Sequence, residues 1–250
     1  MEGQIDCTEV SRLLETEVKS AAESFREKRG RAPRLALVCA NDGSEQQATE
    51  LEQACKEAGI ATEVQRFGNG GTARDVMNYI RVLNADSGTE AIALCGRQEN
   101  GTATAVDFRK DANRIAVPRA VIEALEKGGV SLEGKHIVII NRSRRIGLPL
   151  AKMLLDKNAT VTICHTKTFD LSWHTSQADI LITAAGKPGL VSGGMVKEGA
   201  IIVDLGGDTD AESMKEKERN VIPFTGCLDA VAAAVILKNA AEIFSNGTSR

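Results

Sequence analysis

The chain has 250 residues, 42% of them hydrophobic and 26% charged, which allows one large or two modest globular domains and excludes a disordered composition. The formal net charge is -3 with the basic residues spread along the chain, so no electrostatic footprint for nucleic acid is visible. No stretch is apolar enough to be a membrane span or a signal peptide, and we therefore expect a cytoplasmic protein without a membrane partner.

In the first half, segments with helical and strand periodicity alternate, as in repeated βαβ units with a parallel sheet. The expected helices cover residues 10–28, 45–58 and 73–84, and the expected strands cover residues 34–40, 61–67 and 90–95. The polar segment from Gly96 to Asn113 has no clear period and is predicted to be a loop that crosses between domains.

In the second half, a short helix is expected from Pro118 to about Gly128, and a second series of strands and helices follows. Strands are expected at residues 136–141, 160–164, 179–183, 200–205 and 221–223, with helices at 147–157 and 229–244. The last, alanine-rich helix is expected to pack back across the first domain. The pattern predicts a two-domain α/β protein, with a three-layer amino-terminal domain and a Rossmann-type domain.

The cysteines and histidines give no sign of a metal centre. The three histidines lie far apart, and the six cysteines have no paired spacing. We therefore expect no metal, and we expect reduced, mainly structural thiols at all six cysteines, which are Cys7, Cys39, Cys55, Cys95, Cys164 and Cys227.

The strand at residues 136–140 runs directly into a turn and then into a helix, an arrangement that suits a pyrophosphate. Such a turn points backbone N–H groups and the positive end of the helix at the phosphates. The sequence lacks the common GxGxxG pattern, so an ordinary turn between a strand and a helix is the alternative. The candidate cofactor-binding residues here are Asn141, Arg142, Ser143, Ile146 and Gly147.

Two further segments follow expected strands of the same sheet. The first segment lies where a Rossmann sheet selects the adenosine ribose, and Arg142 with Thr166 and Lys167 suits a 2′-phosphate, so NADP is favoured over NAD; a solvated charged loop is the alternative. The second segment has glycines at strand ends, where the backbone can lie against a nicotinamide ring. The candidates in these segments are His165, Thr166, Thr168, Ala185, Gly186, Lys187, Asp204 and Gly206.

Together these segments resemble the methylenetetrahydrofolate dehydrogenase/cyclohydrolase family, often called FolD. The family's Gly-Arg-Ser turn appears as Asn141-Arg142-Ser143, its Ala-Thr-Val-Thr-x-Cys-His segment as residues 159–165, and its Ala-Asp-Ile strand as residues 178–180. The resemblance implies an NAD(P)-binding Rossmann domain at residues 118–228 and a substrate domain at residues 1–117 plus 229–250. It also implies a folate as the small-molecule substrate and a homodimer.

The resemblance assigns the family's catalytic positions to residues of different chemistry. Leu51 stands at the position of the acid/base Lys, Gln47 at that of the Tyr and Cys95 at that of the Gln. Asn113 stands at the position of the loop Asp, with Asp111 as the candidate substitute. Leucine neither takes nor gives a proton, so the expected base is missing.

Three hypotheses follow. The first is an NAD(P)-dependent methylenetetrahydrofolate dehydrogenase whose cyclohydrolase activity is weak or lost. The second is a diverged NAD(P)-binding homologue that acts on another small substrate, with Cys95, Arg97, Asp111 and Asp229 as candidate groups. The third is a non-catalytic protein that binds the nucleotide without turning it over.

Overall fold

The computed structural model describes residues 5–40, 44–68, 71–96 and 102–247, and these divide into two compact units. The three-stranded unit takes residues 11–116 and the chain from residue 233 onward. The five-stranded unit takes residues 117–232 and the chain up to residue 10. Each unit is built around its own parallel sheet. The chain is therefore a two-domain α/β protein, as predicted.

The three-stranded unit has a parallel sheet in the order β2-β1-β3. Its strands are β1 (Arg34–Cys39), β2 (Ala61–Arg66) and β3 (Ala91–Cys95). The central strand β1 is flanked on both sides, with Leu35 opposite Thr62 of β2 and opposite Ala91 of β3. Its apolar residues face helices on both sides of the sheet, which explains why β1 and β3 are near-continuous hydrophobic runs.

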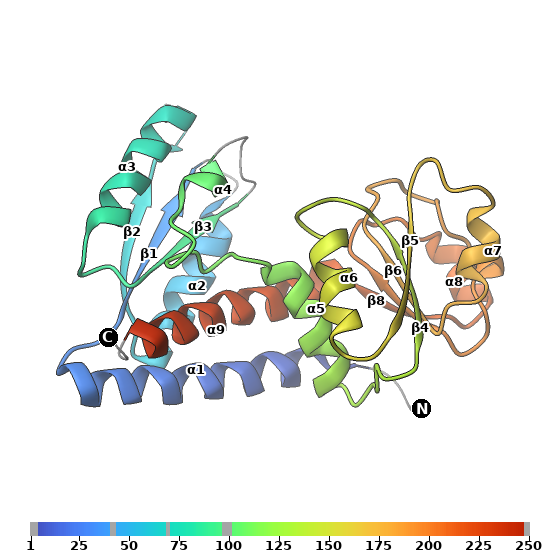
Figure 1. The fold of residues 1–250 in the computed structure, drawn as a ribbon, viewed down its shortest axis with the longest axis horizontal. Helices are drawn as coiled ribbons and strands as arrows, with labels where there is room; N and C mark the ends of the chain where they lie inside the picture. Colours follow the sequence, from blue (N-terminus) through green and yellow to red (C-terminus); the bar gives the residue numbers. More distant parts are fainter. Residues whose placement is uncertain (1–4, 41–43, 69–70, 97–101, 248–250) are drawn as a thin grey trace. The chain divides into compact units, whose positions relative to one another are not determined.

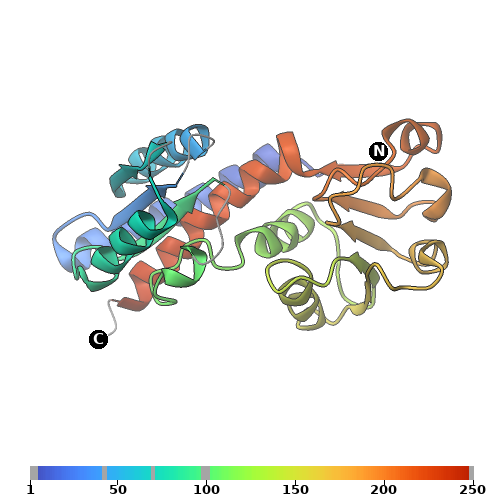
Figure 2. The ribbon, with the colours of Figure 1, turned by 90° about the horizontal axis from the view of Figure 1, so that it is seen from above.

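Helices cover the two faces of this sheet. They are α1 (Cys7–Arg29), α2 (Glu45–Ala58), α3 (Ala73–Ala85), α4 (Thr102–Ala105) and α9 (Asp229–Gly247). Helix α3 begins at a capping box between Thr72 and Asp75, and it packs with α4 on one face of the sheet. Helices α1 and α9 run side by side (Figures 1 and 2), where Phe25 meets Phe244 edge to face with ring centroids 5.9 Å apart.

All the elements expected for this unit are present, with ends shifted by a few residues. The last helix packs on this unit as predicted, because the Asn239 side chain donates hydrogen bonds to the carbonyl oxygens of Ala112 and Arg114. The segment expected to be a loop crossing between domains contains regular structure: it includes α4, and Asp111 forms a parallel bridge with Ile92 of β3. The prediction of a loop was wrong at those positions.

The five-stranded unit has a fully parallel sheet in the order β5-β4-β6-β7-β8. The strands are β4 (His136–Ile140), β5 (Thr160–Cys164), β6 (Ile180–Thr183), β7 (Ile201–Asp204) and β8 (Asn220–Pro223). From β4 the chain turns to β5 on one side and then crosses to β6 on the other. The reversal of strand order therefore lies between β4 and β6, and ligands of open α/β sheets bind at such a point.

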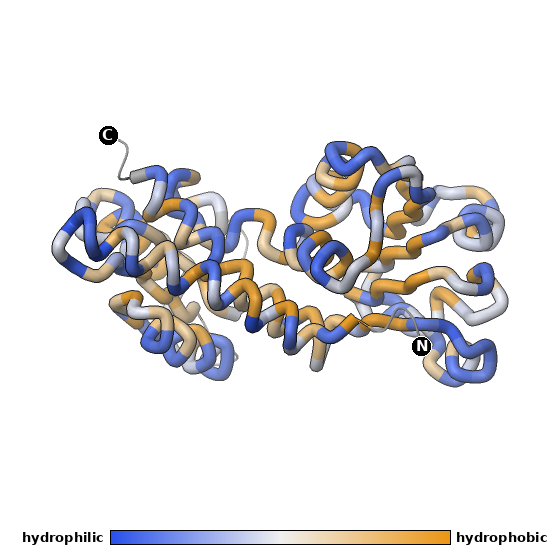
Figure 3. Tube along the Cα trace, turned by 90° about the horizontal axis from the view of Figure 1, so that it is seen from below, coloured by the Kyte–Doolittle hydropathy of each residue, from blue (hydrophilic) through white to orange (hydrophobic). Residues whose placement is uncertain are grey.

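The helices of this unit lie on the two faces of its sheet. Helices α5 (Ala116–Lys127) and α6 (Gly147–Leu155) lie on one side, and α7 (Leu171–Thr175) and α8 (Ala211–Glu216) on the other (Figure 1). On the second side, Leu171 and Met214 join Val138, Leu181 and Ile202 in one buried cluster. Hydrophobic residues follow the strands, and polar residues gather in the connecting loops (Figure 3).

Several short elements of this unit were not expected from the sequence. They are α7, α8, the 3₁₀ turn Gly193–Met195 and the π-helical turn Phe224–Leu228. Helix α5 begins at Ala116, two residues before Pro118. A proline is tolerated in the first helical turn because the backbone N–H groups there have no partner within the helix.

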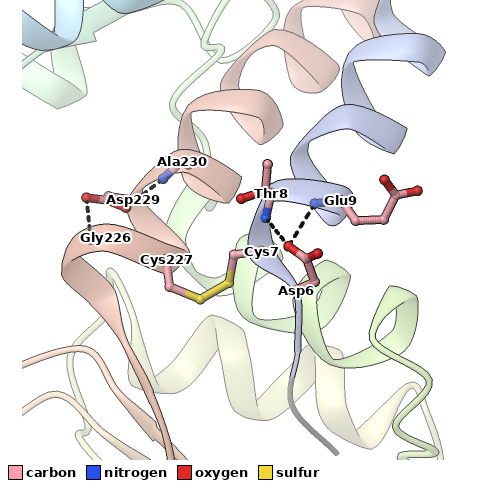
Figure 4. The surroundings of a disulfide bond; sticks show 8 residues. All are labelled: Asp6, Cys7, Thr8, Glu9, Gly226, Cys227, Asp229 and Ala230. Carbon is pink, nitrogen blue, oxygen red and sulfur yellow. Dashed lines mark hydrogen bonds between the residues drawn. A yellow bond between two sulfur atoms is a disulfide. The ribbon is translucent and has the colours of Figure 1, made fainter.

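One disulfide corrects the expectation that all six cysteines are reduced. Cys7, at the start of α1, is bonded to Cys227, two residues before α9, with Cα atoms 5.2 Å apart (Figure 4). Asp6 accepts hydrogen bonds from the backbone N–H groups of Thr8 and Glu9, so a capped helix start carries one of the two sulfurs. The remaining four cysteines are free and buried.

In the described residues, no helix is both long and apolar enough to cross a membrane.

Candidate functional site

The three segments predicted to bind a dinucleotide meet at one edge of the five-stranded sheet. The last residues of the strands lie in register, since Ile140 of β4 is opposite Cys164 of β5 and Thr183 of β6, and Thr183 is opposite Asp204 of β7. Because all the strands are parallel, the loops that follow them emerge at the same edge. This edge includes the point of strand-order reversal between β4 and β6.

Asn141, directly after β4, ties this edge together with its side chain. Its Oδ1 atom accepts hydrogen bonds from the backbone N–H groups of Ser143 (2.8 Å) and Gly147 (3.1 Å). Its Nδ2 atom donates to the carbonyl oxygen of Ala184, the residue after β6, at 2.6 Å. The side chain therefore closes the turn on itself and spans the reversal point from β4 to β6.

Two further backbone N–H groups of the turn, those of Ile146 and Leu148, are also engaged within it. Ser143 Oγ accepts from the N–H of Ile146 (3.1 Å), and the N–H of Leu148 donates to the Ser143 carbonyl oxygen (3.0 Å). Pro149 has no N–H. At the start of α6, the N–H groups of Gly147 and Leu148 therefore donate to the chain's own oxygens in this structure.

Gly147 is required where α6 begins. A Cβ atom on this residue would lie 2.0 Å from the carbonyl oxygen of Asn141, far inside van der Waals contact. The absence of a side chain lets the first turn of α6 approach the end of β4, which is the role of a glycine in close helix and strand packing.

The loop after β5 presents polar and cationic groups at the same edge. Thr168 Oγ1 accepts from the N–H of His165 (2.8 Å), and His165 Nδ1 accepts from the N–H of Lys167 (3.1 Å). The proton of a neutral His165 ring is therefore on Nε2, which makes that atom a donor. Thr166, Lys167 and, across the edge, Arg142 are exposed, so their hydroxyl and cationic groups are accessible to an anion.

The loop after β6 is held in shape by Asp208, a residue that the sequence reasoning missed. Its side chain is fully buried. Its carboxylate accepts from Thr183 Oγ1 (2.6 Å) and from the backbone N–H groups of Ala185 (2.7 Å) and Lys187 (2.5 Å). The three exposed residues Ala185, Gly186 and Lys187 are thus fixed by a carboxylate beneath them.

Asp204, at the end of β7, shapes the next loop in the same way. Its carboxylate accepts from the N–H groups of Gly206, Asp208 and Thr209 and from Thr209 Oγ1, at 2.6–3.1 Å. Burial by itself would raise its pKa, but these hydrogen bonds outweigh burial and lower the pKa. A Cβ on Gly206 would lie 2.8 Å from the backbone nitrogen of Gly186, so the two loops touch at a glycine.

In the three-stranded unit, the side chains at the predicted catalytic positions are buried or hydrogen-bonded to other parts of the protein. Leu51 of α2 is buried, with 1% of its surface exposed. Gln47, one turn earlier, accepts from the N–H of Gly96 through Oε1 at 2.6 Å. Cys95 and Cys39 hydrogen-bond to each other at the paired ends of β3 and β1, and burial raises the pKa of both thiols. None of these groups is a reactive acid or base at neutral pH.

The candidate loop after β3 is similarly tied down. The carboxamide of Asn113 bonds to the backbone of Leu94 in β3 as the backbone of a neighbouring strand would: its Oδ1 accepts from the N–H of Leu94 (2.6 Å) and its Nδ2 donates to the Leu94 carbonyl oxygen (2.9 Å). Lys110 donates to the carbonyl oxygens of Leu83 and Asp86 at the end of α3, and burial lowers its pKa. Burial raises the pKa of the Asp111 carboxyl group.

The remaining candidates are Asp229 and Arg97, and a pocket lies elsewhere in the three-stranded unit. A pocket of about 590 Å³ lies at the amino end of β2, where Lys56 and Arg26 line it, and this is the opposite end of the sheet from Cys39 and Cys95. Asp229 caps the start of α9 by accepting from the N–H groups of Gly226 and Ala230. Arg97 lies outside the described residues. Within the described ranges, no three His, Cys, Asp or Glu side chains form a metal-binding group.

Comparison with known proteins gives the family directly. Residues 115–248 match the model of the tetrahydrofolate dehydrogenase/cyclohydrolase NAD(P)-binding domain, and residues 5–112 match that of the catalytic domain of the same family. The chain belongs to the tetrahydrofolate dehydrogenase/cyclohydrolase family.

Similar proteins agree with this FolD assignment. The bifunctional protein FolD of Caldanaerobacter subterraneus subsp. tengcongensis is 38% identical, over 96% of each chain, and that of Pelotomaculum thermopropionicum is 33% identical, over 94% of each chain. The crystal structure of the FolD enzyme of Campylobacter jejuni superposes with a TM-score of 0.85 at 28% identity, covering 98% of this chain and 99% of the other.

Membership of the FolD family gives the two sets of predicted residues their context. All thirteen candidate cofactor residues, Asn141 to Gly206, fall inside the match to the NAD(P)-binding domain. Gln47, Leu51, Cys95 and Asp111 fall inside the match to the catalytic domain. The role of each individual residue remains a prediction.

Proposed function

We propose that this protein is an NAD(P)-dependent 5,10-methylenetetrahydrofolate dehydrogenase in which the cyclohydrolase step is weak or lost. The observation that carries the proposal is the contrast between its two halves. The FolD-type dinucleotide edge is built from ordered loops, whereas Leu51, which the sequence resemblance assigns to the position of the family's acid/base lysine, has a buried apolar side chain.

The chemistry of the edge after β4, β5 and β6 fits an NADP molecule. Arg142, Thr166 and Lys167 offer exposed cationic and hydroxyl groups to a 2′-phosphate, and we propose that they favour NADP over NAD. The exposed backbone around Gly186 has no side chain to keep a planar ring away. The bound dinucleotide would supply the hydride acceptor, and the protein's part is to bind and orient it.

The two reactions of the family place different demands on the protein. Hydride transfer depends chiefly on holding the two reactants in the correct geometry, so it survives without a protein base. Hydrolysis needs a group that moves protons, and removing one costs on the order of 10²-fold or more in rate. The side chains of Gln47, Asn113 and Lys110 are engaged with backbone groups, which supports loss of that step.

We further propose that residues 118–228 form the cofactor domain, that residues 1–117 plus 229–250 form the folate domain, and that the protein is a cytoplasmic homodimer. A diverged substrate or a non-catalytic role in binding the nucleotide remains the alternative. The raised pKa of Asp111 favours the first of these alternatives, because a protonatable carboxyl would suit a different reaction.

Binding and turnover test the proposal in one preparation. Trp173 is the only tryptophan in the chain and lies on α7, which follows the ribose loop, so energy transfer from Trp173 to NADPH reports occupancy. We expect saturable binding of NADPH, weaker binding of NADH, and reduction of NADP when 5,10-methylenetetrahydrofolate is added.

Each outcome points to one hypothesis. NADPH binding without binding of the folate contradicts the dehydrogenase and favours a diverged substrate. Binding of both ligands without turnover favours a non-catalytic protein. The Lys56→Ala variant is the control. This exposed lysine lies on α2 beyond Leu51, so its loss should leave NADPH binding and NADP reduction unchanged.

A further inference from the structure

The side-chain oxygen of Asn141 accepts hydrogen bonds from backbone N–H groups at the start of a helix, as an anion can. A helix start binds an anion because its first N–H groups have no partner within the helix. Here the side-chain oxygen of Asn141 accepts from Gly147, the first residue of α6, and from Ser143 in the preceding turn. Both N–H groups are thereby satisfied by one neutral oxygen.

The same side chain is anchored so that it does not swing away at low cost. Its Nδ2 atom donates to the carbonyl oxygen of Ala184 at 2.6 Å, which fixes the orientation of the carboxamide. A ligand oxygen that displaced Asn141 Oδ1 would have to break two hydrogen bonds to Oδ1 and disturb a third from Nδ2. An internal acceptor held in this way competes directly with a phosphate.

We propose that Asn141 closes the backbone phosphate site of the β4–α6 turn, so that this protein binds the diphosphate of its dinucleotide without the N–H groups of Ser143 and Gly147. Asn141 is thus a positioning residue that limits affinity for the diphosphate. The inference rests on the proposed dinucleotide-binding function and specifies which part of the ligand contributes to it.

The variants Asn141→Ala and Asn141→Asp separate this proposal from a purely structural role. Asn141→Ala frees both N–H groups, so NADPH and inorganic pyrophosphate should bind roughly tenfold tighter, as two charge-assisted hydrogen bonds replace neutral ones. Asn141→Asp keeps the acceptor and adds a negative charge, so NADPH should bind several-fold more weakly. Adenosine 2′-monophosphate has no diphosphate, and its affinity should not change in either variant.

Titration calorimetry with these three ligands on the full-length protein decides the matter, and thermal unfolding shows that each variant is folded. If Asn141 only holds the fold together, Asn141→Ala, which loses all three hydrogen bonds, weakens NADPH and adenosine 2′-monophosphate together, and the proposal is overturned. It is also overturned if pyrophosphate binds Asn141→Ala no better than the wild type. If Asn141→Ala does not fold, unchanged NADPH affinity in Asn141→Asp overturns it.

Failure of the proposed function looks different from failure of this inference. A wild-type protein that binds neither NADPH nor NADH contradicts the dinucleotide function. The comparison of pyrophosphate binding between the wild type and Asn141→Ala still tests whether Asn141 closes the turn.

Discussion

Asp204 and Asp208 show how single carboxylates build the candidate cofactor edge. Each accepts several hydrogen bonds from its own loop or from the neighbouring one, and each is nearly or fully buried, with 5% and 0% of its surface exposed. A buried carboxylate that receives this many donors is stabilised in its charged form and fixes the loop backbone around it. The loops at the candidate cofactor edge are therefore ordered by carboxylates beneath them.

The Asp204→Asn variant should lower the free energy of unfolding at pH 7 by about 1–3 kcal/mol. The NH₂ group of the new amide cannot accept the hydrogen bonds that Thr209 donates from its backbone N–H and its hydroxyl to Asp204 Oδ2. Because the folded pKa of Asp204 is lowered, its stabilisation is fully present above the ordinary aspartate pKa of about 4 and is lost as the pH falls through the folded pKa. The deficit of the variant should therefore shrink in acid.

Urea unfolding at pH 7 and at about pH 3 measures this change in the deficit. The control is Asp156→Asn, an exposed residue whose partner is Lys152. An equal deficit at both pH values, or one that Asp156→Asn reproduces, would show that the lowered pKa of Asp204 does not contribute to stability.

At this scale the sequence predicted positions better than contacts. Asp204, Gly147 and Gly206 stand out because each lies at the end of a strand or in the turn that follows one, and all three are at the predicted edge. Asp208 was missed because an acidic residue in a polar loop has no periodic signal, and its importance appears only when the loop folds back onto β6. The hydrogen bonds of Asn141 were likewise invisible, since they depend on its rotamer.

The packing of α6 against β4 depends on one glycine. The Gly147→Ala variant places a Cβ 2.0 Å from the Asn141 carbonyl oxygen, so the turn must shift. We expect a loss of about 1–3 kcal/mol in stability and weaker NADPH binding, because the displaced turn carries Arg142. Chemical denaturation and Trp173 fluorescence measure the two effects.

Gly194→Ala is the matched control for this substitution, since a Cβ there meets nothing within 4 Å. It should leave both stability and NADPH affinity unchanged. If Gly147→Ala behaves like Gly194→Ala, the close approach of α6 to β4 does not hold in solution.

The regular elements were predictable from the sequence to the extent that they are long or fully buried. Strands such as His136–Ile140 are continuous apolar runs, and long helices such as Glu45–Ala58 have a clear apolar face. The elements α7, α8 and α4 have four to six residues each, which is too few to establish a period. Their formation depends on caps such as Asp170 and Asp210 and on tertiary packing.

At the scale of the whole molecule, the Cys7–Cys227 disulfide joins residues 220 positions apart. A link across so long a loop restricts the unfolded chain, and its loss should cost about 2–5 kcal/mol. The Cys7→Ser/Cys227→Ser variant should therefore unfold at a lower temperature than the oxidised wild type. A reductant should lower the unfolding temperature of the wild type but not of the variant.

Thiol titration of the denatured, unreduced protein checks the disulfide independently. Four reactive thiols are expected, from Cys39, Cys55, Cys95 and Cys164. Six thiols would show that the bond is absent and would restore the expectation of fully reduced cysteines.

Both domains of the FolD family match this chain, whereas the residues that the sequence resemblance assigns to the family's proton-transfer positions, Leu51 and Gln47, carry no acid/base group. The sequence predicts this division because Leu51 and Gln47 are chemically unlike the Lys and Tyr expected at those positions. The structure adds that Leu51 is buried and that the Gln47 side chain is hydrogen-bonded to the backbone of Gly96, so neither side chain supplies a proton-transferring group.

The most direct test compares two rates in one purified sample: oxidation of 5,10-methylenetetrahydrofolate with NADP, and hydrolysis of 5,10-methenyltetrahydrofolate without it. We predict a saturable, NADP-dependent oxidation and a hydrolysis slower by on the order of 10²-fold or more, close to the rate in buffer. Enzymatic hydrolysis as fast as the oxidation would contradict the loss of the proton-transferring group at residue 51.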